Sequence, residues 1–550
     1  MSGAAEPSAS GAEDPRADLR WGTLPALVAD AARRHGDHEA LVDGGRRLTY
    51  AELADEATTF ARALMAWGLA PGDRVAVWAP NSAEWVVAAL GILGAGGVLV
   101  TVNTRFKGAE AAYILATSGA RLLCTVTGFL GTDYPALLEG EDTGGLEHTV
   151  LLAGRPGSPG PEELATFVGR AGAVAPAAAV ARAEAVQPGD VCDLLFTSGT
   201  TGRPKGAAAT HAQTLRAFGT WAAVAGLRPG DRYLVVNPFF HSFGYKAGLL
   251  TSLMVGATVF PEAVFDAGRV LERVAAERIS VLPGPPALYQ SLLDHPDLGH
   301  HDLSSLRLGV TGSSVIPVEL VVALHERLGF ETVLTAYGLT ECGGVATMCR
   351  RGDPVELVAT TSGRAVEGVE VVVADASGVP VPAGEPGEVL VRGYGVMPGY
   401  WEDPQATAEV IGPDGWLHTG DVGVMDGAGY LAITDRLKDM FVVGGFNAYP
   451  AEIEGVLRAL PGVAQVAVIG VPDQRLGEVG CAWVVPGPGG PPSPEQLGRF
   501  ARPRLANFKV PRFVVVADEL PVNAAGKVLK RELRRRIEAG VAAPVPVPPG

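Results

Sequence analysis

Cysteine and lysine are both scarce in this 550-residue chain. Its five cysteines are scattered and form no Cys-x-x-Cys pair, which argues against a disulfide framework and predicts reduced thiols in a cytoplasmic protein. Only seven basic residues are lysine, against 37 arginines. Arginine therefore serves as the general surface cation, and each lysine is a candidate for a specific role as a compact ammonium group.

Positive charges are outnumbered by negative ones, and long uncharged runs are scarce. The net charge of −16 argues against binding of nucleic acid through bulk attraction. Residues 1–20 lack the basic and apolar regions of a signal peptide, so we expect a disordered leader. The uncharged run 85–102 contains four glycines, which predicts a buried helix and a core strand instead of a membrane span.

What the sequence does contain is enough apolar material for a large core. Apolar residues make up 47% of the chain, and its length predicts a large domain with a smaller one. Short apolar runs alternate with helix-like segments, which is typical of an α/β fold. Short antiparallel strands after residue 363 predict a β-rich subdomain. We expect a leader (1–20), a large α/β domain (21–435), a hinge (436–439), a small mobile α+β domain (440–537) and a disordered tail (538–550).

A loop of hydroxyls and glycines closed by a lysine occupies residues 194–206. It reads Leu-Leu-Phe-Thr-Ser-Gly-Thr-Thr-Gly-Arg-Pro-Lys-Gly, so a strand runs directly into the loop. Glycines let the backbone approach a polyphosphate, hydroxyl and N–H groups donate to its oxygens, and Lys205 offsets its charge. The common phosphate loop Gly-x4-Gly-Lys-Ser/Thr does not fit, because Gly206 follows Lys205.

This loop resembles the signature of the adenylate-forming superfamily, which comprises acyl-CoA synthetases, luciferase-like enzymes and peptide-synthetase adenylation domains. Further stretches match that superfamily in order: 337–341, 415–421, 435–439, 444–452 and 523–527. The resemblance implies an enzyme that joins a carboxylic acid to ATP as an acyl-adenylate, releases pyrophosphate, and then transfers the acyl group to a thiol. It implies Mg²⁺ as cofactor, with ATP and CoA as co-substrates.

The resemblance also assigns residues to each step. For ATP and AMP it implies the phosphate loop, an adenine wall and a ribose-binding pair: Thr197, Ser198, Gly199, Thr200, Thr201, Gly202, Lys205, Gly312, Ser313, Ser314, Tyr337, Gly338, Asp421 and Arg436. For catalysis it implies Thr340 beside the phosphate, Glu341 on Mg²⁺, Lys527 between α-phosphate and carboxylate, and Lys438 as the pivot of the small domain. The channel for the pantetheine arm of CoA would be lined by Gly444, Gly445 and Phe446.

The stretch 237–246 matches the region that shapes the acyl pocket of the superfamily. Amino-acid-activating relatives place an aspartate here, whereas residues 239–242 are Phe-Phe-His-Ser. An unpaired ammonium in an apolar pocket would be costly, which argues against amino acids. His241 resembles the gate of the acyl tunnel in CoA ligases, although it also fits a satisfied core histidine. The second stretch at this pocket, 281–286, contains Gly284.

Several stretches, including 239–250 and 468–480, more closely resemble one actinobacterial group of CoA ligases. Its members act on a bicyclic, ketone-bearing indane propanoate that remains when steroid rings A and B have been removed. We therefore expect Tyr245 and Lys246 to donate hydrogen bonds to a distal oxygen of the acid. The alternative for Lys246 is a side chain that points to solvent at the pocket mouth.

Other functions stay open on the sequence alone. The chain also fits a CoA ligase for medium-chain or aryl acids, and a stand-alone adenylation enzyme that loads a carrier protein. Its expected partners are small molecules, namely the acid, ATP and CoA, with neither nucleic acid nor a membrane span. A homodimer is left open.

Overall fold

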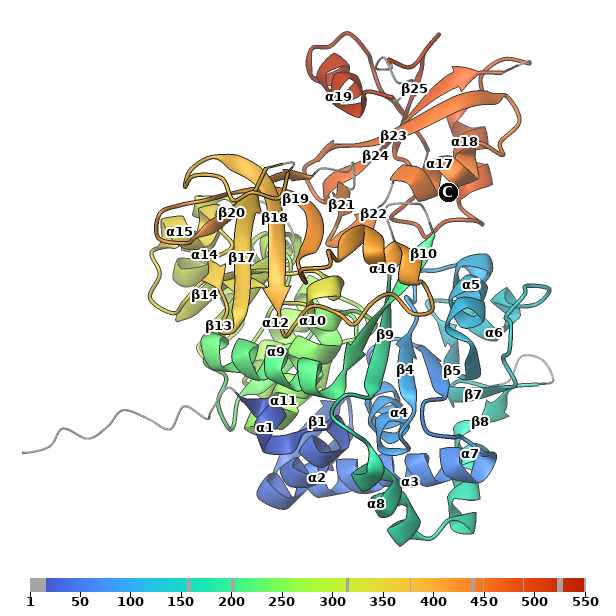
Figure 1. Ribbon diagram of the computed structural model, residues 1–550, viewed down its shortest axis with the longest axis vertical. Helices are drawn as coiled ribbons and strands as arrows, with labels where there is room; N and C mark the ends of the chain where they lie inside the picture. The colour runs from blue at the N-terminus through green and yellow to red at the C-terminus, as the bar shows by residue number, and fades with distance from the viewer. Residues whose placement is uncertain are drawn as a thin grey trace, which may run out of the picture.

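The computed structural model describes residues 16–155, 160–198, 203–312, 316–375, 377–436, 441–448, 450–487, 489–521 and 528–548. Figure 1 shows a large body that runs from blue to gold, and a small domain, orange to red, above it. The large body contains two mixed sheets with helices against them and a separate antiparallel sheet. This arrangement confirms the predicted α/β fold with a β-rich subdomain and a small C-terminal domain.

The first sheet of the large domain has a parallel centre that is buried on both faces. Its strand β4 (Val98–Thr101) is buried along its full length, and helix α4 (Ala83–Gly94) before it is buried on nearly all sides, as predicted for 85–102. The strands lie in the order β10 (Pro204–Thr210), β9 (Val191–Ser198), β4 (Val98–Thr101), β3 (Arg74–Trp78), β5 (Ala120–Phe129), β7 (His148–Ala153) and β8 (Glu162–Glu163), with β6 (Thr132–Asp133) beside β5.

The second sheet consists of two four-stranded parts that meet at one residue. Val281 bridges to Tyr233 on one side and to Leu308 on the other. Residues 279–282 thus contribute a single bridge, and Pro283 and Pro285 lack the N–H groups that would extend it into a strand. The parts are β11 (Arg232–Val235), β12 (Thr258–Pro261), β1 (Glu39–Asp43), β2 (Arg46–Thr49), and β13 (Leu308–Gly312), β14 (Thr332–Tyr337), β15 (Thr347–Met348), β16 (Arg364–Ala365).

Helices pack against these sheets and are bounded by conventional caps. In α3, Thr49 and Glu52 form a capping box at the start, and Gly68 adopts a left-handed conformation at the end. The helices of the large domain are α1 (Ala17–Trp21), α2 (Leu24–His35), α3 (Tyr50–Trp67), α4 (Ala83–Gly94), α5 (Gly108–Ser118), α6 (Tyr134–Leu137), α7 (Leu164–Gly169), α8 (Pro176–Ala185), α9 (His211–Ala225), α10 (Ser242–Gly244), α11 (Thr251–Val255), α12 (Ala267–Glu277), α13 (Pro286–Leu293), α14 (Val318–Arg327), α15 (Val355–Thr360) and α16 (Pro404–Val410). A π-helical turn, Tyr245–Leu250, joins α10 to α11.

The β-rich subdomain and the small domain each contain one further sheet. The subdomain sheet is an antiparallel meander of β17 (Val369–Ala374), β18 (Pro386–Gly393), β19 (Leu417–Met425) and β20 (Leu431–Arg436). The small domain contains β21 (Phe441–Val443), β22 (Phe446–Ala448), β23 (Val463–Asp473), β24 (Gly477–Pro486), β25 (Phe513–Val516) and β26 (Val545–Pro546), with helices α17 (Pro450–Leu457), α18 (Pro494–Ala501) and α19 (Lys530–Glu538).

Both predicted disordered ends need correction. Helix α1 begins at Ala17, inside the predicted leader. In the predicted tail, β26 pairs with β25, and the N–H of buried Val547 donates to the Arg512 carbonyl. The Pro/Val-rich composition suggested a chain without structure, but the exposed edge of β25 supplies the hydrogen-bond partners that the tail needs. The predicted hinge at 436–439 falls almost entirely outside the described residues.

No single helix among the described residues is long and apolar enough to cross a membrane. One bent pair, residues 164–173 with 176–185, passes that test by length and composition alone.

Candidate active site

The predicted phosphate loop is held by an antiparallel hairpin. Strands β9 and β10 pair so that Thr197 lies opposite Lys205, directly at the two ends of the loop. Gly206 packs under the ring of Phe196, since a Cβ there would lie 3.0 Å from the ring. The hairpin therefore fixes the hydroxyl of Thr197 and the ammonium of Lys205 on either side of the loop.

A polar cluster at this hairpin contains the predicted magnesium ligand. Thr197 Oγ1 and Tyr400 Oη both donate to Glu341 Oε1, each over 2.9 Å. The ammonium of Lys205 lies 5.2 Å from the centre of the Tyr400 ring and 4.0 Å from Glu409 Oε2. Tyr400 was not predicted from the sequence, yet it holds the glutamate and faces the lysine.

The donor set of this cluster fits Mg²⁺. Among the described residues no group of three or more His, Cys, Asp or Glu side chains could enclose a metal ion. Mg²⁺ commonly needs no such cage, because it keeps several waters and binds one or two carboxylates together with substrate phosphates. A single carboxylate, Glu341, beside a polyphosphate loop meets that requirement.

The predicted adenine and ribose residues meet at the ends of two strands. Tyr337 ends β14, and its hydroxyl donates to Asp421 Oδ2 over 2.8 Å. Asp421 is buried on β19 opposite Arg436, next to an irregularity in the strand pairing. Burial, together with the charge of Asp421, raises the pKa of Tyr337 well above its usual value, so this phenol stays protonated and remains a donor.

Two predicted glycines lie where a side chain would not fit. A Cβ on Gly312, at the end of β13, would lie 2.8 Å from the Ala336 carbonyl oxygen. A Cβ on Gly338 would lie 2.5 Å from the Gly344 carbonyl oxygen. The backbone next to Tyr337 is therefore closely packed, which keeps this wall of the site thin and rigid.

The predicted CoA residues form a turn of the small domain that reaches the large domain. Gly444 and Gly445 connect β21 to β22 with φ values of 55° and 86°, a region that favours glycine. Gly445 lies close to Pro285, since a Cβ there would be 3.5 Å from that ring. The ring of Phe446 lies 6.5 Å from that of Phe240. The turn thus meets both stretches predicted to shape the acyl pocket.

His241 stands at this meeting point. Its Nδ1 accepts a hydrogen bond from the Phe243 N–H, which caps α10. The side chain is accessible to solvent, yet surrounding protein desolvates it enough to lower its pKa from 6.5 to about 4. Its exposure to solvent argues against the alternative of a core histidine. The imidazole is therefore neutral at pH 7.

Lys246 does not lie where the sequence suggested. Its side chain is only 4% exposed, and its Nζ lies 2.9 Å from Asp193 Oδ1 and donates to Thr214 Oγ1 over 3.2 Å. The prediction of a solvent-facing lysine is wrong, and the predicted donor to the acid is corrected to one half of a buried ion pair. The reason is Asp193, a carboxylate on buried strand β9 that needs a cation.

The two remaining residues predicted for the acyl pocket are Tyr245 and Gly284. Tyr245 is fully buried beside Trp85, with ring centres 5.7 Å apart, and its hydroxyl has no hydrogen-bond partner among the described residues. Gly284 lies between the two halves of the second sheet and donates its N–H to the Val310 carbonyl. Both residues stay predicted pocket residues.

Several predicted site residues lie outside the described part of the chain. They are Gly199, Thr200, Thr201, Gly202, Ser313, Ser314, Lys438 and Lys527. The backbone of Ser198 and Arg436 is described, but their side chains are not. The roles implied for all of these residues stay predictions. Thr340 opens a short 3₁₀ turn, Thr340–Cys342, that carries Glu341 toward Thr197.

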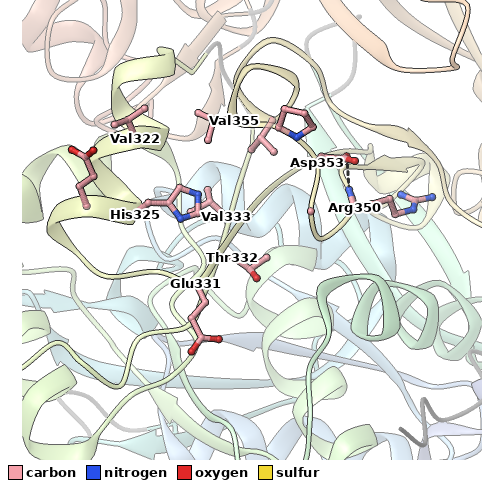
Figure 2. A pocket seen from close by; sticks show the side chains of 12 residues that line it. Val322, His325, Glu331, Thr332, Val333, Arg350, Asp353 and Val355 are labelled. Carbon is pink, nitrogen blue, oxygen red and sulfur yellow. Dashed lines mark hydrogen bonds between the residues drawn. The ribbon is translucent and has the colours of Figure 1, made fainter. Parts of the chain in front are cut away.

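A cavity of about 510 Å³ lies apart from this site, at the opposite end of β14. Figure 2 shows His325, Glu331, Arg350 and Asp353 around it. Two of its polar groups are occupied within the protein: His325 Nδ1 bonds the Phe330 carbonyl, and the guanidinium of Arg350 donates to backbone carbonyls.

The fold and the site define a class of protein. The chain matches the family described as AMP-binding enzyme over residues 28–401, and the AMP-binding enzyme C-terminal domain over residues 452–527. The chain belongs to the AMP-binding enzyme family, which confirms the superfamily suggested by the motifs.

Several known proteins are similar to the chain over nearly its whole length. Two proteins named 3-(7a-methyl-1,5-dioxo-octahydro-1H-inden-4-yl)propanoyl:CoA ligase are similar to the chain. The one from Rhodococcus jostii is 49% identical over 93% of this chain and 98% of its own length, and the one from Mycobacterium tuberculosis is 50% identical over 94% and 99%. A solved structure of o-succinylbenzoate CoA synthetase from Bacillus subtilis, bound with a product analogue, is 27% identical, with a TM-score of 0.77 over 93% of this chain and 98% of its own.

Proposed function

We propose that this chain is an ATP- and Mg²⁺-dependent acyl-CoA ligase whose acid is a bicyclic, ketone-bearing indane propanoate. The observation that carries the proposal is the near-50% identity, over almost the whole chain, with two ligases named for that acid. A two-step reaction is supported by the Gly444–Phe446 turn of the small domain, the predicted CoA channel, which meets the predicted acyl region of the large domain at Phe240 and Pro285.

In the first half-reaction a carboxylate oxygen attacks the α-phosphate of ATP and pyrophosphate leaves. Thr197 and Lys205, fixed by the β9–β10 hairpin, would hold the terminal phosphates. Mg²⁺, when bound at Glu341, would offset negative charge on those phosphates. Tyr400 keeps the Glu341 carboxylate in place. The hydrogen bond from Tyr337 orients Asp421, whose carboxylate would accept the ribose hydroxyls. Lys527 would serve the α-phosphate.

In the second half-reaction a thiol attacks the acyl carbon and AMP leaves. The thiol must reach the acyl carbon from the face opposite to the phosphate loop. The turn at Gly444–Phe446 packs against Phe240 and Pro285 on the large domain, so a pantetheine arm that follows this turn would emerge at His241. A neutral His241 adds no charge that would hold a carboxylate at this point.

The acyl region also suits an acid that carries an oxygen at its far end. The residues predicted to shape it belong to a buried aromatic cluster, in which Trp85 packs on Phe239 and on Tyr245. The hydroxyl of Tyr245 and Nε1 of Trp85 are buried without hydrogen-bond partners among the described residues, and such groups are costly to leave unsatisfied. A ketone oxygen of the bicyclic acid would supply an acceptor for one of them.

A panel of acids tests the proposal. The purified chain would be incubated with ATP, Mg²⁺ and CoA, together with the bicyclic keto acid, a medium-chain fatty acid or an aryl acid, and the thioester would be detected by mass. We expect kcat/KM for the bicyclic acid to exceed the others by about 10-fold or more, the value of one recognised ketone. A preference for either other acid would overturn the substrate, and acylation of a carrier protein but not of CoA would overturn the thiol.

Two further expectations stay predictions. The five cysteines, all buried and without disulfides, fit the predicted reducing cytoplasm. The homodimer left open by the sequence is tested by the solution mass of the protein.

A further inference from the structure

The small domain touches the large domain at a second place, away from the Gly444–Phe446 turn. Lys509 lies on the small domain between α18 and β25, and its side chain is only 1% exposed. Its Nζ donates to Glu452 Oε1 of α17 over 2.7 Å and to Glu110 Oε1 of α5 over 3.0 Å. Figure 1 shows α5 directly beneath the small domain. One ammonium thus joins a carboxylate of its own domain to a carboxylate of the other.

Aromatic rings complete the enclosure of this lysine. Its Nζ lies 4.4 Å from the centre of the Phe106 ring on the large domain and 5.6 Å from that of Phe508 on the small domain. Phe508 in turn packs on Phe446 of the predicted CoA turn, with ring centres 5.0 Å apart. The contact at Lys509 and the turn are therefore parts of one packed unit.

We infer that Glu110 is a positioning residue for thioester formation: it holds Lys509, and with it the small domain, in the arrangement that presents the Gly444–Phe446 turn to the acyl region. This inference rests on the proposed two-step ligase. Rotation of the small domain would separate Lys509 from Glu110, while Glu452 would rotate together with the lysine. The contact between Lys509 and Glu110 is therefore present in one arrangement of the domains and lost in the other. The contact between Lys509 and Glu452 is kept in both.

The electrostatics of the trio agree with this assignment. Burial raises the pKa of Glu452 to about 7, although the charge of Lys509 opposes that shift. Burial would lower the pKa of Lys509, but the two carboxylates raise it above its usual value. The ammonium is therefore charged at pH 7 and needs a full counter-charge, which Glu110 supplies from the other domain.

The second oxygen of Glu110 has a separate, local task. Its Oε2 accepts the N–H of Lys107 and caps the start of α5. A glutamine can keep this cap, because its amide oxygen also accepts a hydrogen bond. Glu110→Gln therefore removes the charge that faces Lys509 and preserves the helix start. Glu52→Gln is the matched control, since Glu52 holds the same capping position on α3 and lies exposed.

The test measures the two half-reactions separately in these variants. We expect the KM for CoA of Glu110→Gln to rise about 10-fold, because the arrangement that accepts the thiol is depleted, with kcat recovering at saturating CoA. Acyl-adenylate formation, followed by pyrophosphate exchange, should change less than about twofold, because that step uses the other arrangement. Glu52→Gln should change neither. An unchanged KM for CoA, or equal losses in both half-reactions, would overturn the inference.

A readout without catalysis separates this inference from the proposed function. The native cysteines are buried, so spin labels can be directed to Asp142→Cys on the large domain and Arg531→Cys on the small domain, both exposed positions. In the ligand-free protein, Glu110→Gln should shift the inter-label distances away from the wild-type population. If the wild type forms no thioester but the distances shift, the ligase proposal fails and the positioning role stands. Identical distances in both proteins would refute the positioning role.

Discussion

Replacing Lys246 by methionine separates a structural lysine from one that recognises substrate. Methionine keeps a stem of similar length and removes the ammonium that pairs with Asp193. The Asp193 side chain is fully buried, and its Oδ2 accepts a hydrogen bond from the weak thiol donor of Cys192. Breaking a buried pair by removing one partner costs about 3–5 kcal/mol, because the remaining charge has no solvent to replace it.

A double variant separates the lost ion pair from general damage to the core. Lys246→Met leaves the Asp193 carboxylate buried without its cation, which destabilises the folded protein. The double variant Asp193→Asn with Lys246→Met removes both charges and should regain most of the loss. Chemical denaturation measures all three proteins.

Activity completes this test. Because Lys246 faces Asp193 and Thr214, the folded variant should lose similar fractions of kcat/KM with the keto acid and with a plain aliphatic acid of similar size. Full stability combined with a selective loss on the keto acid, by about 10- to 150-fold, would refute this reasoning and restore Lys246 as the donor to the ketone.

Three other outcomes follow from the site and its surroundings. Tyr400→Phe removes a donor to the Glu341 carboxylate, so pyrophosphate exchange should slow by about 10-fold, and an unchanged rate would show that this contact has no role. Lys527→Ala should abolish acyl-adenylate formation and leave thioester formation from supplied acyl-adenylate largely intact, whereas equal losses would refute its role. Burial lowers the pKa of His211 to about 4, so its unfolded form binds the extra proton between pH 6.5 and 4. As the pH falls from 6.5 to 4, the free energy of unfolding should therefore decrease by up to about 3 kcal/mol because of His211. The variant His211→Gln should lack this part of the pH dependence.

The sequence predicted those parts of the site whose residues are close together in the chain. The sequence predicted a strand that runs into a loop at 194–206; the structure confirms that strand as β9 and adds β10, which places Lys205 opposite Thr197. The glycines at 444 and 445 were predicted as part of the CoA channel, and the structure adds that they form a tight turn with positive φ values. Such features depend on local backbone geometry and need no knowledge of the fold.

Contacts between distant segments were not predictable in the same way. Tyr400 reaches Glu341 across 59 residues, and Lys509 reaches Glu110 across 399, with no local pattern that links the partners. The scarcity of lysine indicated that Lys246 has a specific partner. We predicted the substrate as that partner, whereas the structure shows Asp193. An aspartate in the apolar run 191–196 was the overlooked signal, because a buried carboxylate requires a cation.

The most direct test of the account follows one oxygen atom from the acid. The bicyclic propanoate, labelled with ¹⁸O in both carboxyl oxygens, would be converted by the purified chain with ATP, Mg²⁺ and CoA, and the products would be weighed by mass spectrometry. Attack of the carboxylate on the α-phosphate predicts one ¹⁸O in AMP, one in the acyl-CoA and unlabelled pyrophosphate. Label in inorganic phosphate with ADP as the nucleotide product, or AMP without label, would contradict acyl-adenylate formation at this site.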